Sequence, residues 1–166
     1  MKAEKKPEQK KQWIAVIRIK GKPGLKVDVR KTFEVLRLYK KYHCVVIPNT
    51  AEYVGMLTKI KDASTWGEID QETLKVLLQK RGKLAQKKAL TEDYLKDKVN
   101  VGFDDLVKEV FAFKKTLGGV PGLKLFFKLS PPRHGFEQKG IKLPYSLGGV
   151  LGYRKDKVND LLKRMV

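Results

Sequence analysis

One stretch near the N-terminus constrains the fold more than any other, because its first residues are apolar on both faces of a strand. Residues 13–20, Trp-Ile-Ala-Val-Ile-Arg-Ile-Lys, run directly into the turn Gly21-Lys22-Pro23-Gly24. The segment Ile14–Ile17 is apolar at every position, which is typical of a strand covered on both sides, whereas Arg18 and Lys20 are charged. We therefore predict a central strand that leads out of the core into a basic turn.

Helical and strand patterns alternate through the residues that follow. Apolar residues at helical spacing predict two amphipathic helices, and short apolar or β-branched runs predict two strands. The expected elements are a helix with Val29, Phe33, Leu36 and Tyr39 inward, a strand over residues 44–47, a helix with Val54, Leu57 and Ile60 inward that is capped by Asn49 or Thr50, and a strand over residues 64–69. The sequence thus predicts the order strand, helix, strand, helix, strand.

The second part of the chain is more helical and more charged. Residues 70–98 and 103–115 have helical patterns, and we interpret residues 70–115 as a helical insertion packed against the sheet. A short strand is expected over residues 123–129, and a closing helix over residues 155–165. The insertion carries the acidic residues Glu92, Asp93, Asp97, Asp104, Asp105 and Glu109. These acidic residues indicate either a face of the insertion that points away from a bound polyanion or an ordinary solvated surface.

The net charge restricts the kind of partner. The 37 Lys and Arg residues against 18 Asp and Glu residues leave a formal net charge of +19, in a chain whose 42% hydrophobic content is that of a folded domain. Residues 13–42 carry nine of the basic and two of the acidic residues, and residues 133–166 carry eight and three. Self-repulsion of this size favours a polyanionic partner, with nucleic acid the leading candidate. An anionic membrane is the weaker alternative, because the sequence has neither an 18-residue apolar run nor a basic helix with a wide apolar face.

Motifs that carry chemistry are scarce. With a single cysteine, Cys44, the chain can form no disulfide of its own, which suits a reducing, cytosolic compartment. Cys44 lies in an apolar run, where burial would raise its thiol pKa, so we expect a buried thiol. His43 and His134 have no Cys, His or Asp partner at metal-ligand spacing. In the half phosphate loop Gly135-x4-Gly140, Ile141 replaces the required lysine. We therefore predict no enzymatic activity, no cofactor, no metal and no small-molecule substrate.

The most unusual stretch is a loop rich in glycine, proline and cations before the final helix. It runs Arg133-His134-Gly135-Phe136-Glu137-Gln138-Lys139-Gly140-Ile141-Lys142-Leu143-Pro144-Tyr145 and continues into Ser146-Leu147-Gly148-Gly149. Its glycines allow the backbone to approach phosphates closely, and its two aromatic residues suit packing beneath the loop or stacking on a base. His134, beside Arg133, is expected to be a polar or phosphate contact.

Several of these segments together resemble one protein family. Arg30-Lys31-Thr32, Val45-Val46-Ile47-Pro48-Asn49-Thr50, Gly55-Met56-Leu57, Thr65-Trp66-Gly67-Glu68-Ile69 and the closing Gly148-Gly149-x-x-Gly152-Tyr153-Arg154-x-Asp156-Lys157-x-Asn159 are similar to the large-subunit ribosomal proteins called L-thirty in bacteria and L-seven in eukaryotes. The match covers nearly the whole chain, and the short N-terminal arm resembles the archaeal form. Lys155 departs from the pattern, because the family usually has a small or acidic residue there.

The resemblance implies an α+β, ferredoxin-like βαβαβ core with a three-stranded sheet in the order 3-1-2, plus the helical insertion and the C-terminal helix. We expect a single domain with a flexible basic arm (1–12), a βαβαβ RNA-binding core (13–69), and a remainder (70–166) that packs on the core. The resemblance also implies a structural role in the cytoplasm on large-subunit ribosomal RNA, among other large-subunit proteins. An assembly or RNA-processing factor that is absent from mature subunits is the alternative.

Ten residues are predicted to contact RNA, since they lie in the basic segments that match the family. They are Lys20, Lys22, Arg30, Lys31, Arg133, His134, Lys139, Lys142, Arg154 and Lys155. We expect arginines to hold phosphates with two parallel hydrogen bonds, and we expect counterion release to drive binding.

Overall fold

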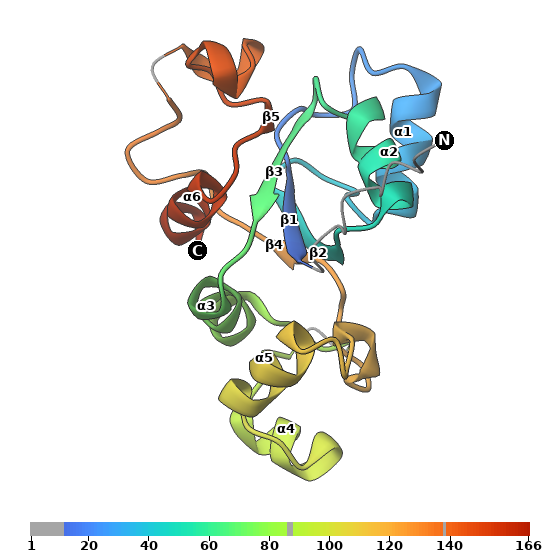
Figure 1. Ribbon diagram of the computed structural model, residues 1–166, viewed down its shortest axis with the longest axis vertical. Coiled ribbons are helices and arrows are strands. Elements are labelled where there is room, and N and C mark those ends of the chain that lie inside the picture. Colours follow the sequence, from blue (N-terminus) through green and yellow to red (C-terminus); the bar gives the residue numbers. More distant parts are fainter. Residues whose placement is uncertain (1–11, 86–87, 138) are drawn as a thin grey trace, which may run out of the picture.

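A computed structural model describes residues 12–85, 88–137 and 139–166, and they form an α+β fold (Figure 1). The predicted arm, residues 1–12, lies outside the described residues except for Gln12, whose carbonyl accepts a hydrogen bond from the Asn49 N–H at 2.8 Å. The described strands are β1 (Trp13–Arg18), β2 (His43–Pro48), β3 (Ser64–Glu68), β4 (Phe127–Lys128) and β5 (Gly152–Tyr153).

The strands make one sheet in the order β4-β2-β1-β3-β5, in which β5 runs parallel to β3 and the other pairs are antiparallel. The prediction of a three-stranded sheet is therefore wrong, although the three expected strands are neighbours at its centre. The two additional strands are two residues long, so they have no periodicity that a sequence could display. Their pairing depends on distant segments, because β4 adds to β2 and β5 adds to β3.

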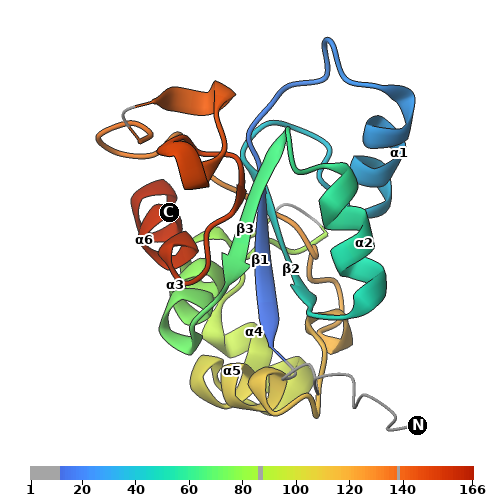
Figure 2. The same ribbon diagram turned by 45° about the horizontal axis from the view of Figure 1, so that its top comes forward.

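The central strand is covered on both sides, as predicted. Ile14 and Val16 of β1 pack with Phe33 and other residues of one core, and Ala15 and Ile17 belong to a second core on the opposite face. All six residues of β1 are buried. Figure 2 shows the two helices α1 (Val27–Val35) and α2 (Ala51–Lys59) on one side of the strands, and α3 (Gln71–Arg81) and α6 (Lys157–Met165) on the other.

The first helix ends earlier than the apolar spacing predicts. Helix α1 stops at Val35, and Arg37 adopts a left-handed conformation with φ of 59° while the Leu38 N–H bonds to the Phe33 carbonyl. This turn buries Leu36 and Leu38 but leaves Tyr39 43% exposed, so the inward position expected for Tyr39 is wrong. The second helix begins after Thr50, whose side chain makes no capping hydrogen bond.

The helical patterns of residues 70–115 give three helices, α3, α4 (Glu92–Val99) and α5 (Phe103–Phe111). The first of these patterns is broken at Gly82, where α3 ends. The chain passes so close to the Leu78 carbonyl oxygen there that a Cβ would not fit. Thr91 caps helix α4, because its hydroxyl accepts a hydrogen bond from the Tyr94 N–H at 3.4 Å. Of the strand expected over residues 123–129, only β4 forms. The remaining helical turns are η1 (Leu117–Gly119), η2 (Gly140–Lys142) and η3 (Tyr145–Leu147).

The C-terminal helix packs on β3 at a point where the strand has no side chain. A Cβ at Gly67 would meet the carbonyl oxygen of Lys155, just before α6 begins. Asn159 fixes the same contact, because its amide donates to the Glu68 carbonyl at 3.0 Å and its oxygen accepts from the Asp70 N–H at 3.0 Å. None of the helices in the described ranges is both long and apolar enough to cross a membrane.

Candidate nucleic-acid interface

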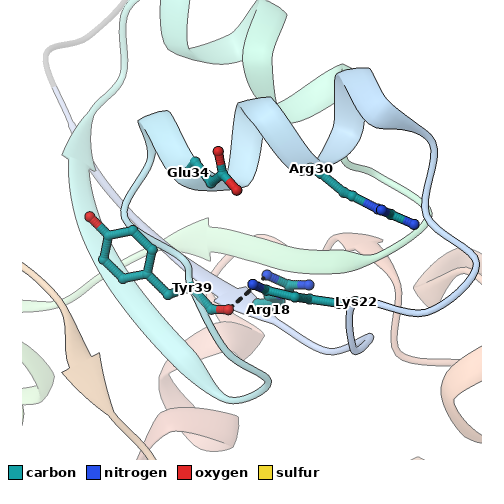
Figure 3. Close-up of a pocket in the computed structure, with 5 residues that line it drawn as sticks. All are labelled: Arg18, Lys22, Arg30, Glu34 and Tyr39. Carbon is teal, nitrogen blue, oxygen red and sulfur yellow. Dashed lines mark hydrogen bonds between the residues drawn. The ribbon is translucent and has the colours of Figure 1, made fainter.

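The first group of predicted RNA contacts surrounds the turn after β1. Lys22 and Arg30 are exposed and line one hollow together with Arg18, Glu34 and Tyr39 (Figure 3). Lys20 is partly buried and lines a different hollow beside Lys59 and Asp62, and Lys31 is exposed on α1. The structure thus places Lys22 and Arg30 around one hollow and Lys20 in another. We call Lys22, Arg30 and Tyr39 the turn surface.

Arg18 lies beneath the turn surface and fixes its shape. Arg18 is 2% exposed, and its guanidinium donates hydrogen bonds to the carbonyls of Lys20 at 2.8 Å and Leu38 at 2.7 Å. It also donates to the Tyr39 carbonyl at 3.3 Å, the dashed line in Figure 3, and lies 4.3 Å from the centre of the Phe33 ring. Burial lowers the pKa of Arg18. Because an arginine pKa starts far above neutrality, the charge remains and the group acts as an interior donor.

The second group lies in the Gly-rich loop of residues 130–151. Arg133, His134, Lys139 and Lys142 are exposed there, and Lys155 is exposed just beyond it. The loop closes on itself, since the Leu143 carbonyl accepts hydrogen bonds from the N–H groups of Val150 and Leu151 at 3.0 and 3.2 Å. Gly149 permits this closure, because a Cβ there would collide with Leu143. Residues 143–151, directly after Lys139 and Lys142, are therefore held in shape by main-chain hydrogen bonds.

Arg154 differs from the other predicted contacts, because it is enclosed. The residue is 2% exposed, and its guanidinium donates to Glu137 Oε1 at 2.8 Å, to Thr65 Oγ1 at 2.9 Å and to the Val150 carbonyl at 3.0 Å. It also lies 4.7 Å from the centre of the Tyr145 ring. In this position Arg154 cannot reach a phosphate without giving up these bonds. Arg154 therefore lies in the interior, where it ties the Gly-rich loop to β3, and its predicted contact with RNA stays a prediction.

Glu137 is the carboxylate at the centre of this network. Its second cationic neighbour is Arg164 of α6, at 3.6 Å. Partial burial opposes ionisation of Glu137, but the hydrogen bond from Arg154 and the charges of Arg154 and Arg164 outweigh it and hold the pKa of the carboxyl below its usual value. Glu137 is therefore ionised at neutral pH and joins the loop to α6.

A further group of cations gathers along the edge strand β4, and the sequence analysis missed it. Arg81, Lys83, Lys124 and Lys128 surround Phe126 and line one hollow. We call these five residues the β4-edge surface. Lys80-Arg81-Gly82-Lys83 is visible in the sequence as a basic run, but nothing in the sequence indicates that it meets residues 124–128.

Neither histidine nor the cysteine forms a reactive site. His43 is 4% exposed and stacks on Phe126 with ring centres 5.0 Å apart. Burial, together with the charges of Lys128, Lys40 and Arg18, lowers the pKa of His43 to about 4, so it is neutral at pH 7. Cys44 is buried in β2 as predicted, and burial raises the pKa of its thiol. Across residues 12–85, 88–137 and 139–166, no three His, Cys, Asp or Glu side chains are grouped to hold a metal.

Comparison with known proteins gives consistent matches. The profile of the family described as ribosomal protein L30p/L7e matches residues 14–63. Over 152 residues the chain is 47% identical to the large ribosomal subunit protein uL30 of Methanococcus vannielii, covering 92% of this chain and 98% of that protein. The uL30 proteins of Nanoarchaeum equitans and Methanopyrus kandleri are each 41% identical, over 92% and 89% of this chain and 97% and 100% of theirs. The similarity therefore covers about nine-tenths of this chain and nearly the full length of each relative.

Proposed function

The chain belongs to the ribosomal protein L30p/L7e family, and from this premise we propose that it is a structural constituent of the large ribosomal subunit, where it binds and stabilises folded ribosomal RNA. The observation that carries the proposal is the similarity to the archaeal large ribosomal subunit proteins uL30, which covers nearly the full length of this chain and of those proteins. The role is structural and not enzymatic. It places the protein in the cytoplasm as part of the ribosome, in contact with ribosomal RNA and with other large-subunit proteins.

The fold supports this role by holding cations on rigid elements. In our proposal β1, α1, β2, α2 and β3 are the ferredoxin-like core, residues 13–69, and residues 70–166 pack on it in the same domain. The exposed cations of the first group lie on the turn after β1 and on α1, and those of the second lie in the Gly-rich loop and just before α6. The first includes Lys22 and Arg30, and the second includes Lys139, Lys142 and Lys155.

Binding is driven mainly by electrostatics in this proposal. Each phosphate neutralised by a lysine or arginine releases counterions, so affinity falls as salt rises. Lys20, Lys31, Arg133 and His134 complete the set of proposed contacts, and Arg154 supports the loop from within. With about ten phosphate contacts, the affinity should fall by roughly 10³ to 10⁵ between 50 and 200 mM salt.

The first experiment is mass spectrometry of large subunits purified through a high-salt wash. One copy of the chain per particle is expected for a structural constituent. Presence below one copy, or loss in the wash, would contradict the proposal and favour an assembly or RNA-processing factor that leaves before the subunit matures.

A further inference from the structure

The β4-edge surface is assembled from two segments that are distant in the sequence. Arg81 ends α3 and Lys83 follows it, whereas Lys124, Phe126 and Lys128 belong to the segment that forms β4. Main-chain bonds join the two segments, since the Lys124 N–H donates to the Lys83 carbonyl at 2.9 Å. Leu84 and Leu123 form an antiparallel bridge beside that bond. These main-chain contacts therefore hold the two segments, and with them the attachment points of the basic side chains, at a fixed separation without a ligand.

Two of the cations are oriented by further contacts. Arg81 donates to Ser130 Oγ at 2.6 Å and lies 3.4 Å from the carbonyl oxygen of Val166, so its guanidinium is held between β4 and the chain end. Lys128 lies opposite His43 in the pairing of β4 with β2. Since His43 is neutral at pH 7, it packs beneath this surface without adding to the positive charge.

The lysine charges of the β4-edge surface are not paired with carboxylates within residues 12–85, 88–137 and 139–166. Every polar residue lining its hollow in the described part of the chain is a cation. None of the three lysines, Lys83, Lys124 and Lys128, belongs to an ion pair among those described residues. The carboxylates of residues 70–115 are instead matched elsewhere, through the pairs Lys75–Asp104, Lys96–Glu92 and Lys115–Glu109. Three gathered lysines that have no carboxylate partner in the described part of the chain, with Arg81 beside them, favour an anion with several regularly spaced charges.

An aromatic cluster connects the β4-edge surface to the turn surface. Phe126 stacks on His43, and Tyr39 meets Phe126 edge-on with ring centres 5.7 Å apart. Tyr39 also lines the hollow that contains Lys22 and Arg30. The two cationic surfaces are therefore neighbours across one tyrosine, and a single extended polyanion can contact both.

We propose that the β4-edge surface is a second RNA-binding surface, on which Arg81, Lys83, Lys124 and Lys128 hold backbone phosphates of the RNA strand that also contacts the turn surface. This inference rests on the proposed function, because it assigns a further part of the same RNA interface. The ligand chemistry is the phosphodiester backbone. Base identity plays no part, since lysine ammonium groups on phosphate oxygens carry no sequence information.

The test measures the salt dependence of binding to a full-length large-subunit ribosomal RNA transcript. The triple variant Lys83→Gln, Lys124→Gln and Lys128→Gln removes three cations and leaves Arg81 in its structural bonds. If the three lysines contact phosphates, the slope of log K against log salt becomes shallower by about 2 to 3, since each lost contact contributes about 0.7 to 0.9. Each single variant should change the slope by about 1.

The matched control is the triple variant Lys75→Gln, Lys96→Gln and Lys115→Gln. It removes the same number of charges, but from lysines that are paired with carboxylates on the helices of residues 70–115. Its salt slope should equal that of the wild type. Equal losses in both triple variants would overturn the inference, because they would show an effect of net charge alone.

Two other outcomes separate this inference from the function on which it rests. If the wild type binds the transcript and the β4-edge variant keeps its slope and affinity, the second surface is disproved while the proposed function stands. If the wild type shows no salt-dependent binding, both fail. Crosslinking from Lys128 in intact subunits provides an independent measurement: crosslinks to nucleotides are expected, and crosslinks to an acidic protein segment alone would overturn the assignment to RNA.

Discussion

Arg18 and Arg154 are each 2% exposed and hydrogen-bonded inside the protein, whereas Lys83 and Lys128 of the β4-edge surface stand exposed without an ion pair in the described residues. The side chains carry the same charge in opposite settings. A guanidinium offers five donors in a fixed plane, so it can satisfy several carbonyl groups at once in the interior. A lysine ammonium is a strongly hydrated point charge that is costly to bury. The basic residues of this chain therefore have two roles: buried arginines hydrogen-bond groups inside the protein, and exposed lysines attract anions at its surface.

The largest expected effect is the loss of Arg154. The substitution Arg154→Leu should lower the free energy of unfolding by about 3 kcal/mol, because it breaks an enclosed ion pair and leaves Glu137, Thr65 and the Val150 carbonyl without their donor. Urea denaturation measures the change. The control Arg133→Gln, on an exposed side chain in the same loop, should stay within about 0.5 kcal/mol of the wild type. If Arg154→Leu left the stability unchanged but weakened RNA binding, Arg154 would belong with the RNA-contacting cations and not with the interior ones.

Arg18 should have the next largest effect. Replacing it with methionine keeps an apolar contact to Phe33 but removes the donor to the Lys20 and Leu38 carbonyls, so we expect a loss of about 2 kcal/mol. Hydrogen exchange should also become faster at the Leu38 amide, since the segment after α1 loses its anchor. A loss below about 0.5 kcal/mol, with exchange at Leu38 unchanged, would show that the interior bonds of Arg18 do not hold the turn surface in place.

His43 sharpens the comparison, because it is a buried basic group that is neutral at pH 7. Its pKa is about 4 in the folded protein, below the value of about 6.5 in an unfolded chain, so between these values the unfolded chain binds the proton and the native state does not. Stability is therefore complete above pH 6.5 and falls as the pH drops towards 4. We expect about 1 kcal/mol to be lost from His43 between pH 6.5 and pH 5.5.

The measurement is the unfolding free energy of the wild type and of His43→Phe across this pH range. Phenylalanine keeps an aromatic ring against Phe126 but cannot titrate, and subtracting its curve removes the contribution of the carboxylates. Two parallel curves would mean that His43 gains no proton on unfolding in this range, and the assignment of a neutral buried imidazole would fail.

The smallest effect is expected from an exposed ion pair. Lys75 and Asp104 are joined at 2.5 Å, but their side chains are 36% and 65% exposed, so solvent screens the attraction. The substitution Lys75→Gln should change stability by about 0.5 kcal/mol or less and leave RNA affinity unaltered. A loss as large as that of Arg18→Met would show that exposed cations also stabilise this fold, and it would remove the distinction between the two settings.

Local patterns predicted much of the fold because they reflect burial directly. The apolar run of β1 required cover on both faces, and the structure provides it through two separate cores. The spacing of Val158, Leu161 and Met165 placed one face of α6 in the interior, where all three residues lie. The buried position of Cys44 followed from the same reasoning. Each of these features depends on neighbours within one strand or helix, so the sequence contains the necessary information.

Edge strands and turns were not predictable in the same way. Strands β4 and β5 exist because residues 127–128 and 152–153 reach the edges of an existing sheet, and two residues display no period of their own. The exposure of Tyr39 follows from the left-handed turn at Arg37, which the helical spacing around it conceals. The meeting of residues 81–83 with residues 124–128 is likewise a property of the packed chain.

The amino-acid pattern was enough to predict a highly cationic α+β domain with a buried central strand, and its motifs resemble the right family. The use of each cation depends on the folded arrangement. Arg154 and Lys155 are adjacent in the chain, yet the first is enclosed against Glu137 and the second is exposed with a left-handed φ of 50°. The physical reason is that net charge and periodicity are sums over the sequence. Whether a given cation meets a carboxylate, a carbonyl or solvent depends on residues that only folding brings to it.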